Sequence, residues 1–350
     1  QDQKVTIDTD KIDNQLNLTN RNYTLGLTNN DQELVLSVSY QSVDNPEVYT
    51  ATPAATILQA NRVGRIVRDY LSGMSLPVAS EGNIWAIPFA SYSSQGGNTL
   101  GYSLSNSGVV IGGDLMQSKT FTAGLFTALG NNTLSPKNGS GKNTMTVLQL
   151  GGYLTKKMGR FNLSGQTFIG SLSHSITRMD GYGFNQSRFN SVQAHAGVEL
   201  GYTLLNKKNS KIIPYTSVAA NWVKTPKIVE VASTGDALTV QKSNSIASTV
   251  ELGMRALSTM TLKSQKINFT SNLGIQYNYN QAQSLVMKSS LSQASYTVSS
   301  INLPKVAFVG GVGVVLPVGN DAQLSFAVQG KVGQQSYQEV IGTMTFDIKF

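Results

Sequence analysis

The last fourteen residues, 337–350, alternate between two kinds of side chain. One parity carries Val340, Gly342, Met344, Phe346, Ile348 and Phe350, and the other carries Glu339, Ile341, Thr343, Thr345, Asp347 and Lys349. Period-two alternation places the two sets on opposite faces of a sheet, one apolar and one bearing charge. A soluble edge strand with such an apolar face would invite aggregation. Closure into a barrel pairs the last strand with the first and lets the apolar face meet lipid.

Upstream segments repeat this alternation, for example 192–204 and 267–279, with runs as long as the about 9 to 11 residues that a tilted membrane strand needs. We predict about twelve strands, near 84–94, 107–117, 120–129, 144–155, 160–172, 188–205, 211–224, 243–257, 266–280, 304–318, 322–334 and 338–350. An even number suits an up-and-down bacterial barrel. The predicted fold class is therefore all-β, a transmembrane antiparallel barrel.

The connections nearly alternate in length. Long loops are expected at 95–106, 130–143, 177–187, 225–242 and 281–303, and shorter turns at 118–119, 156–159, 206–210, 258–265 and 319–322, with a brief final loop near Gln335. Outer-membrane barrels have short periplasmic turns and long external loops, whereas a sandwich does not sort its loops by parity. We expect an outer-membrane location with the long loops outside.

Residues 53–72 form the one convincing helix, with Thr52 as N-cap, Pro53 at the first position and Gly73 as terminator. Its length of about 30 Å matches the hydrocarbon thickness of a bilayer. Two interpretations stay open. The helix lies on a soluble surface, packed on Ile57, Val63, Ile66 and Val67, or it plugs a polar pore.

A basic stripe on this helix, made by Arg62, Arg65 and Arg68 with Asp69 beside it, excludes contact with lipid. Each charge at bilayer depth would cost about 2.5 kcal/mol or more. Strand parity sends a set of carboxylates inward, away from lipid. These are Asp114, Glu199, Glu251, Glu339 and Asp347, and they are expected to pair with the stripe arginines.

Composition excludes several function classes. Only 13% of the residues are charged, against about 25% in an average soluble domain, and there is no run of 18 apolar residues. The net charge of +8 is spread singly and in pairs, so we expect no nucleic-acid partner. With no cysteine and two histidines, neither a zinc site nor any other metal or cofactor site is predicted. No catalytic residue is predicted.

Several short segments carry a family resemblance in their order and spacing. They are the helix before the first strand, IWAIPF at 84–89, GGD at 112–114, TAGL at 122–125, IPY at 213–215, VELG at 250–253 and the final strand ending on Phe350. Over residues 52–350 the chain resembles the translocator (β) domain of classical autotransporters, the type V secretion proteins of Gram-negative bacteria. Residues 1–48 then look like the β-rich end of a passenger, 49–82 like a linker with the helix in the lumen, and 83–350 like the barrel.

The resemblance implies a barrel that anchors its own N-terminal passenger, exports it to the cell surface and often serves virulence. It implies insertion by the barrel-assembly machinery, aided by periplasmic chaperones and guided by the apolar C-terminal strand (Gly342, Met344, Phe346, Ile348, Phe350). Outer-membrane lipid and lipopolysaccharide are the expected surroundings, and a full strand count in one chain implies a monomer. The alternative is an outer-membrane porin without a secreted passenger.

Three further expectations concern the lumen. Inward-facing glycines at 112, 124, 197, 201 and 253 are expected to make room for the helix, with bulges or strand kinks as the alternative. His195 is expected to bond to Glu199 on the same face. Some autotransporters cut themselves at paired asparagines, but Asn61 is single, so self-cleavage with Asp114 or Glu251 as helper is not expected.

Overall fold

The computed structural model describes residues 22–30, 33–41, 45–74, 83–96, 101–179, 183–207, 209–232, 236–262, 265–280, 283–290, 295–319 and 321–349. Phe350, the last residue of the predicted assembly signal, lies outside these ranges, as do residues 1–21 of the predicted passenger end.

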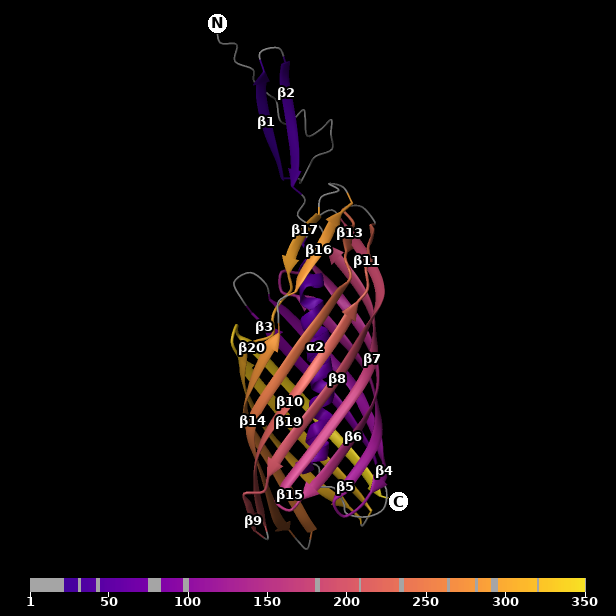
Figure 1. Cartoon of the computed structure of the whole chain (residues 1–350), viewed down its shortest axis with the longest axis vertical. Coiled ribbons are helices and arrows are strands. Elements are labelled where there is room, and N and C mark those ends of the chain that lie inside the picture. Colours follow the sequence, from indigo (N-terminus) through magenta and orange to yellow (C-terminus); the bar gives the residue numbers. More distant parts are fainter. Residues whose placement is uncertain are drawn as a thin grey trace.

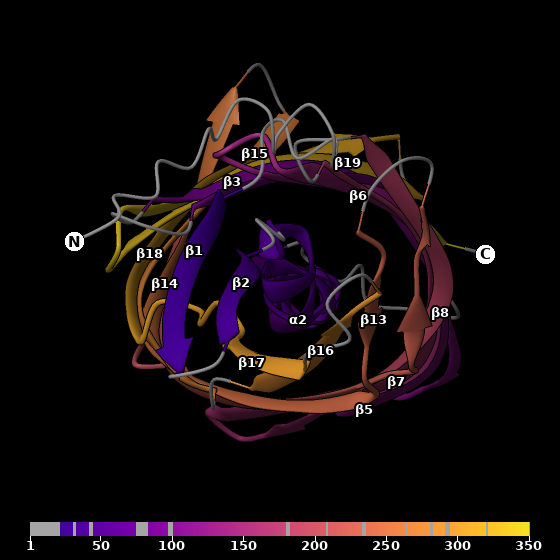
Figure 2. The same cartoon turned by 90° about the horizontal axis from the view of Figure 1, so that it is seen from above.

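Twelve long antiparallel strands close into a barrel around one helix, which confirms the predicted fold class (Figures 1 and 2). The strands are β3 (Asn83–Gln95), β4 (Tyr102–Gln117), β5 (Phe121–Pro136), β6 (Gly141–Met158), β7 (Phe161–Met179), β8 (Phe184–Tyr202), β10 (Ser210–Thr225), β14 (Ser243–Leu262), β15 (Gln265–Asn280), β18 (Val306–Val318), β19 (Ala322–Gly333) and β20 (Tyr337–Lys349). Each pairs with the next along the chain, and β20 pairs with β3.

Several strands extend further than predicted, mostly toward the end where the long connections lie, here called the mouth; β6 and β14 also extend into the short turns, to Met158 and Leu262. Segments expected as loops at 95–106, 130–143 and 177–187 are largely strand, because β4, β5, β6 and β7 continue into them. Their outward residues there are mostly serine, threonine and asparagine, which resembles loop composition. Inward, however, Tyr102, Leu104, Leu134 and Met145 are fully buried, so these extensions have a core to pack against.

Shorter strands lie at the two ends of the barrel. At the mouth, β11 (Ile228–Val229), β13 (Leu238–Val240), β16 (Ser284–Ser289) and β17 (Ser295–Ser299) form a four-stranded sheet, here called the lid sheet, from segments expected as long loops. β12 (Val231–Ala232) pairs with β8, and at the opposite turn end β9 (Leu205–Lys207) pairs with β10. β1 (Asn22–Asn30) and β2 (Glu33–Gln41) form a separate hairpin beyond the mouth in Figure 1.

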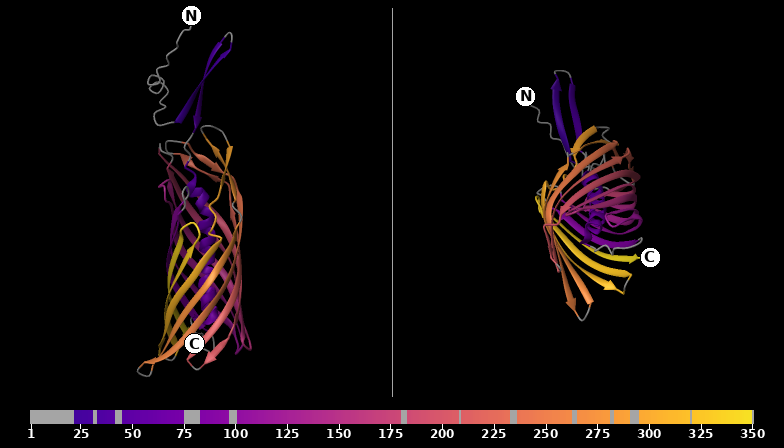
Figure 3. Two further views of the ribbon diagram at one scale, coloured as in Figure 1. Left: turned by 90° about the vertical axis from the view of Figure 1, so that its left-hand side faces the viewer. Right: turned by 60° about the horizontal axis from the view of Figure 1, so that its bottom comes forward.

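The helix α2 (Glu47–Asp69) runs along the barrel axis and continues as a π-helical turn, η1 (Tyr70–Met74) (Figure 3). Its predicted start at Thr52–Pro53 is wrong, since Pro53 lies inside the helix and the Thr52 hydroxyl bonds to the Val48 carbonyl at 2.7 Å. The predicted stop at Gly73 is also displaced from the end of α2. The extra first turn is stable because Val48 and Tyr49 are buried at the mouth. No helix in the described part of the chain has the length and apolar character needed to cross a membrane.

The inward glycines accommodate neighbouring strands rather than the helix, which corrects the expectation for 112, 124 and 253. A Cβ on Gly112 would stand 2.2 Å from the Trp85 ring, and one on Gly124 would stand 2.4 Å from Tyr153. Gly253 lies under the ring of Tyr215 in the same way, at 2.5 Å. Each large side chain leans across the adjacent strand, where only a glycine leaves enough space.

The two other glycines of that set also face barrel residues. A Cβ on Gly197 would stand 2.6 Å from Gln166 Nε2, and one on Gly201 would stand 3.1 Å from Ile213. The space for the helix is instead set by the width of the barrel and by one glycine on the helix itself, Gly64.

Candidate functional site: the filled lumen

The helix presents two faces to two different walls of the lumen. Its alanines and branched aliphatic residues, among them Leu58, Val63 and Val67, pack into apolar clusters. Those clusters draw most of their partners from β3 to β7, here called the apolar wall, including Leu104, Met145, Phe126 and Phe168. The burial of this face excludes the surface-helix interpretation and leaves the helix inside the pore.

The opposite face carries the three stripe arginines toward β8, β10, β14, β15, β19 and β20, here called the charged wall. Nearest the mouth, Arg62 Nε donates to Glu339 Oε1 at 2.5 Å and Arg62 Nη2 donates to Ser93 Oγ at 2.7 Å. Lys331 Nζ lies 3.1 Å from the other oxygen of Glu339. Glu339 thus balances one cation from the helix and one from the barrel.

One carboxylate, Glu251, accepts from both remaining stripe arginines. Arg65 Nη2 donates to its Oε2 at 2.8 Å, and Arg68 Nη2 donates to its Oε1 at 3.1 Å. The hydroxyl of Tyr215 adds a third bond at 2.7 Å. Arg65 also donates to Gln276 Oε1 at 2.6 Å. Among the described ion pairs, those of Glu251 come from the helix alone.

Glu199 has a barrel partner of its own, because Arg255 grips both of its oxygens at 2.5 and 2.7 Å. Arg68 Nε lies 3.5 Å from the same carboxylate. Arg255 stacks on Tyr215, with 3.9 Å between the guanidinium carbon and the ring centroid, and reaches Asp69 of the helix at 3.4 Å. This arrangement replaces the expected His195–Glu199 bond, since residues four apart on a strand lie about 13 Å apart.

The two other predicted lumen carboxylates bond to tyrosines instead of arginines. Tyr153 donates to Asp114 Oδ1 at 2.6 Å, and Tyr70 of η1 donates to Asp347 Oδ2 at 2.8 Å. Both lie toward the turn end, below the level of the arginine stripe. The ring of Tyr70 stacks on Trp85, with centroids 4.5 Å apart.

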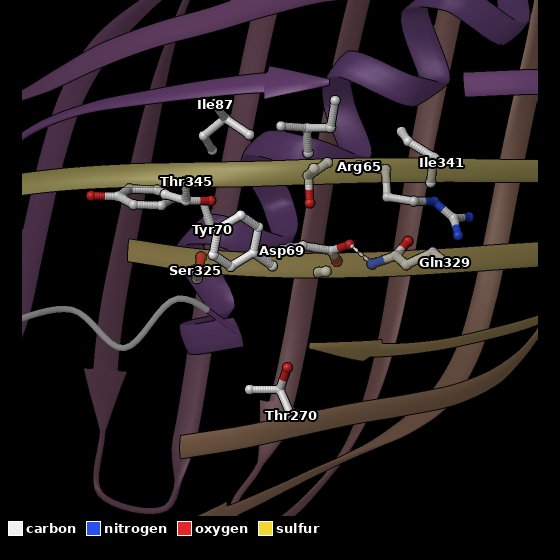
Figure 4. A pocket seen from close by; sticks show the side chains of 13 residues that line it. Arg65, Asp69, Tyr70, Ile87, Thr270, Ser325, Gln329, Ile341 and Thr345 are labelled. Atoms are coloured by element: carbon white, nitrogen blue, oxygen red, sulfur yellow. Dashed lines mark hydrogen bonds between the residues drawn. The ribbon is translucent and has the colours of Figure 1, made fainter. Parts of the chain in front are cut away.

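A small cavity of about 40 Å³ remains between the helix and the strands β15, β19 and β20. Figure 4 shows its lining, in which Asp69 accepts a hydrogen bond from Gln329 Nε2 at 2.6 Å. Thr270, Ser325 and Thr345 supply hydroxyl groups around the same cavity. The charged wall is therefore bridged to the helix by long polar side chains rather than packed against it.

Asn61 lies between the helix and β10, where Asn221 Nδ2 donates to its side-chain oxygen at 2.8 Å. His195 Nδ1 lies 2.8 Å from Asn221 Oδ1, and its ring stacks on Phe168 with centroids 4.7 Å apart. The ring is pressed against the helix, because a Cβ on Gly64 would stand 2.4 Å from His195 Nε2.

At the mouth, hydrogen bonds to Glu230 join the segment beside the lid sheet to the helix. Tyr49, Arg178 and Glu230 are here called the latch. Arg178 holds both oxygens of this fully buried carboxylate at 2.9 and 2.8 Å, and Tyr49 donates to it at 2.7 Å. The backbone N–H of Leu238 adds a bond at 2.7 Å. Burial and the Glu230 carboxylate raise the pKa of Tyr49, so its hydroxyl keeps the proton that it donates.

Sequence reasoning missed Arg255, Lys331 and the Tyr49–Arg178–Glu230 latch. The first two could have been predicted from the sequence. Arg255 shares the inward parity of Glu251, and Lys331 lies eight residues before Glu339 on the adjoining strand. Nothing in the sequence indicates the latch, because Glu230 lies in a segment that reads as a loop.

The predicted assembly-signal residues that the structure describes lie on the outer side of β20. On β20, Phe346 and Ile348 are exposed on the outer surface, and Gly342 and Met344 are half-buried on the same side. His174 is buried between Asn143 and Ser191 at 3.1 and 2.7 Å and stacks on Phe189. Among the described residues no group of three or more acidic or histidine side chains is arranged to hold a metal ion.

Comparison with known proteins gives a consistent picture. The family model of the autotransporter beta-domain matches residues 84–329, and no curated protein matches the chain. The translocator domain of the autotransporter NalP from Neisseria meningitidis superposes with a TM-score of 0.71 at 16% identity, covering 87% of this chain and 99% of that one.

Two further solved structures share the fold. The beta domain of the Bordetella autotransporter BrkA has a TM-score of 0.57 at 16% identity and covers 77% of this chain and 100% of its own. The transport unit of AIDA-I from Escherichia coli has a TM-score of 0.56 at 15% identity, with 89% and 100% covered. The closed barrel, the helix in its lumen and the family match over most of its length place this chain in the autotransporter beta-domain family of outer-membrane translocator barrels.

Proposed function

We propose that this barrel anchors and exports its own N-terminal passenger to the surface of a Gram-negative bacterium, and that α2 is the end of the exported segment, retained as a plug. The observation that carries the proposal is the polarity of the helix. Glu47 lies at the mouth beside the lid sheet, and η1 lies toward the turn end, where β3 begins. A chain upstream of Glu47 therefore leaves the barrel on the mouth side.

The buried ion pairs support a retained rather than a passing helix. Arg62, Arg65 and Arg68 each meet a carboxylate of the barrel, so that withdrawal of the helix would strand charges on both sides. A transient occupant of the pore would not need such matched partners. An ordinary porin would have no use for them either.

Export is tested by protease treatment of whole cells that express the chain with an epitope tag ahead of Gln1. We expect external protease to remove this tag, while a second tag inserted at Gly159, in a turn at the opposite end, stays protected. Protection of both tags would contradict export, and removal of both would show broken cells.

The plug is tested by planar-bilayer conductance. The folded chain should conduct weakly, and deletion of residues 1–72 should raise the conductance several-fold because the lumen empties. Equal conductance of the two proteins would favour the porin alternative.

Assembly by the barrel-assembly machinery, which we also propose, is tested on the final strand. Deletion of Phe350 should lower the amount of inserted barrel in cells at least tenfold. The control is Val332→Lys on β19, which puts a charge on the lipid face outside the final strand. If Val332→Lys lowers insertion as much as the deletion does, or if the deletion has no effect, the final strand is no special signal.

A further inference from the structure

The turn end of the barrel carries a concentration of exposed positive charge. Four neighbouring turn regions contribute, with Lys119 between β4 and β5, Lys156 and Lys157 at the end of β6, Arg160 between β6 and β7, Lys207 at the end of β9, and Lys266 at the start of β15. These six side chains are here called the basic rim, and none of them takes part in the ion pairs found among the described residues. In the same turns and the next one, Asp321 is the one carboxylate that the described residues include.

Large apolar side chains are exposed right beside the basic rim. Leu115 and Met116 precede Lys119, Met158 and Phe161 flank Arg160, and Leu204 and Met260 lie near the other two turns; Leu115 is 69% exposed and Leu204 is 59% exposed. Such side chains would be costly in water. Their position beside cations is typical of an interface between hydrocarbon and lipid headgroups.

Lys156 shows the arrangement in a single row. It follows Leu154 on the outward parity of β6, and its neighbours across the two strand pairs are Phe121 and Leu163. Its ammonium group therefore stands at the lower border of the lipid-facing surface. The stem of such a lysine can lie along apolar residues while the charge reaches the headgroup layer.

The mouth differs on the same strands, because polar residues separate the apolar band from Lys142 at the mouth end of β6. There the outward parity of β6 and β7 continues as Thr144, Thr146, Ser173 and Ser175, so that this wall rises out of the apolar band as a polar surface. On β6 and β7 the apolar band therefore reaches the basic rim at the turn end but stops short of the last residues at the mouth.

We propose that the basic rim binds the headgroups of anionic phospholipids in the leaflet that meets the turn end. The assignment of that leaflet as periplasmic rests on the proposed function, whereas the contact between the basic rim and lipid headgroups does not. Exposed apolar side chains among the cations favour a membrane over an acidic protein partner. Each basic residue near an anionic surface strengthens association about fivefold, so the rim acts as one multivalent site.

The test is native mass spectrometry of the folded chain, titrated in detergent with phosphatidylglycerol, phosphatidylcholine or soluble glycerol 3-phosphate. We expect phosphatidylglycerol to bind at least tenfold more tightly than phosphatidylcholine and glycerol 3-phosphate not to bind. The variant Lys156→Gln/Lys157→Gln/Arg160→Gln should lose most of this preference.

The matched control, Lys137→Gln/Lys142→Gln/Lys288→Gln, removes the same charge from exposed positions toward the mouth and should keep the preference. Equal loss in both variants, or no preference in the unmodified chain, would overturn the proposal. Capture of an acidic protein in place of lipid would overturn it as well. None of these readouts involves the passenger, so failure of export and failure of lipid binding are told apart.

Discussion

The apolar wall and the charged wall hold the same helix by different means. Against β3 to β7 the helix packs side chain to side chain, and Leu58 and Val63 are buried there. Across the lumen it is held at a distance by arginines that reach Glu339 and Glu251, with a small cavity beside them. Packing of this kind is non-directional, whereas the ion pairs demand one register. The apolar wall therefore stabilises the helix by packing, and the charged wall fixes its register along the barrel axis.

Among the predictions, Glu251→Ala in the charged wall should have the largest effect. It leaves Arg65 and Arg68 buried without their main partner, which costs about 3 to 5 kcal/mol. The free energy of unfolding in urea, measured on the folded chain in micelles, should fall by that amount. Ser164→Ala, a buried inward position on β7 whose hydroxyl has no hydrogen bond in the structure, should leave it unchanged. Equal losses would remove the special place of Glu251.

Leu58→Ala weakens the packing of the helix against the apolar wall. The cavity that it leaves beside Leu104 and Met145 should lower the free energy of unfolding by about 3 kcal/mol in the same measurement. The matched control is Leu148→Ala on the lipid face, where lipid refills the space and a smaller loss is expected. A larger loss in the control would mean that the helix contributes little to the packing of the barrel.

The junction between the two walls is probed by Gly64→Ala. The new methyl group collides with His195, and such overpacking costs about 1 to 3 kcal/mol. Combining it with His195→Ala should recover most of the loss, a coupling that a double-mutant cycle measures. If the two losses simply add, the contact does not set the depth of the helix.

The smallest effect is expected for Asn61→Ala, which removes one hydrogen bond from Asn221. Both oxygens of Glu251 and one of Asp114 already accept hydrogen bonds, so we predict no self-cleavage and an unchanged fragment size on gels. A processing band that disappears in this variant would reverse that prediction.

Alternation, the even strand count and the sorting of loop lengths together predicted the barrel, because lipid outside favours apolar side chains at every second position of each strand. The inward direction of Glu251 and Glu339 follows from the same rule. Partner choice does not, since it depends on helix depth and rotation, which Gly64 and His195 fix in three dimensions. The helix start was misjudged because the burial of Tyr49 under the lid sheet outweighs the unfavourable Pro53.

The rings of Trp85, Tyr153 and Tyr215, each lying over a glycine of the next strand, limit how the sequence can drift. At Gly112 even one methyl group would stand 2.2 Å from the indole, so the two positions can change only together. Homologous barrels should therefore show correlated substitutions at these pairs of an aromatic residue and a glycine. In each pair the aromatic residue would have to be replaced before the glycine.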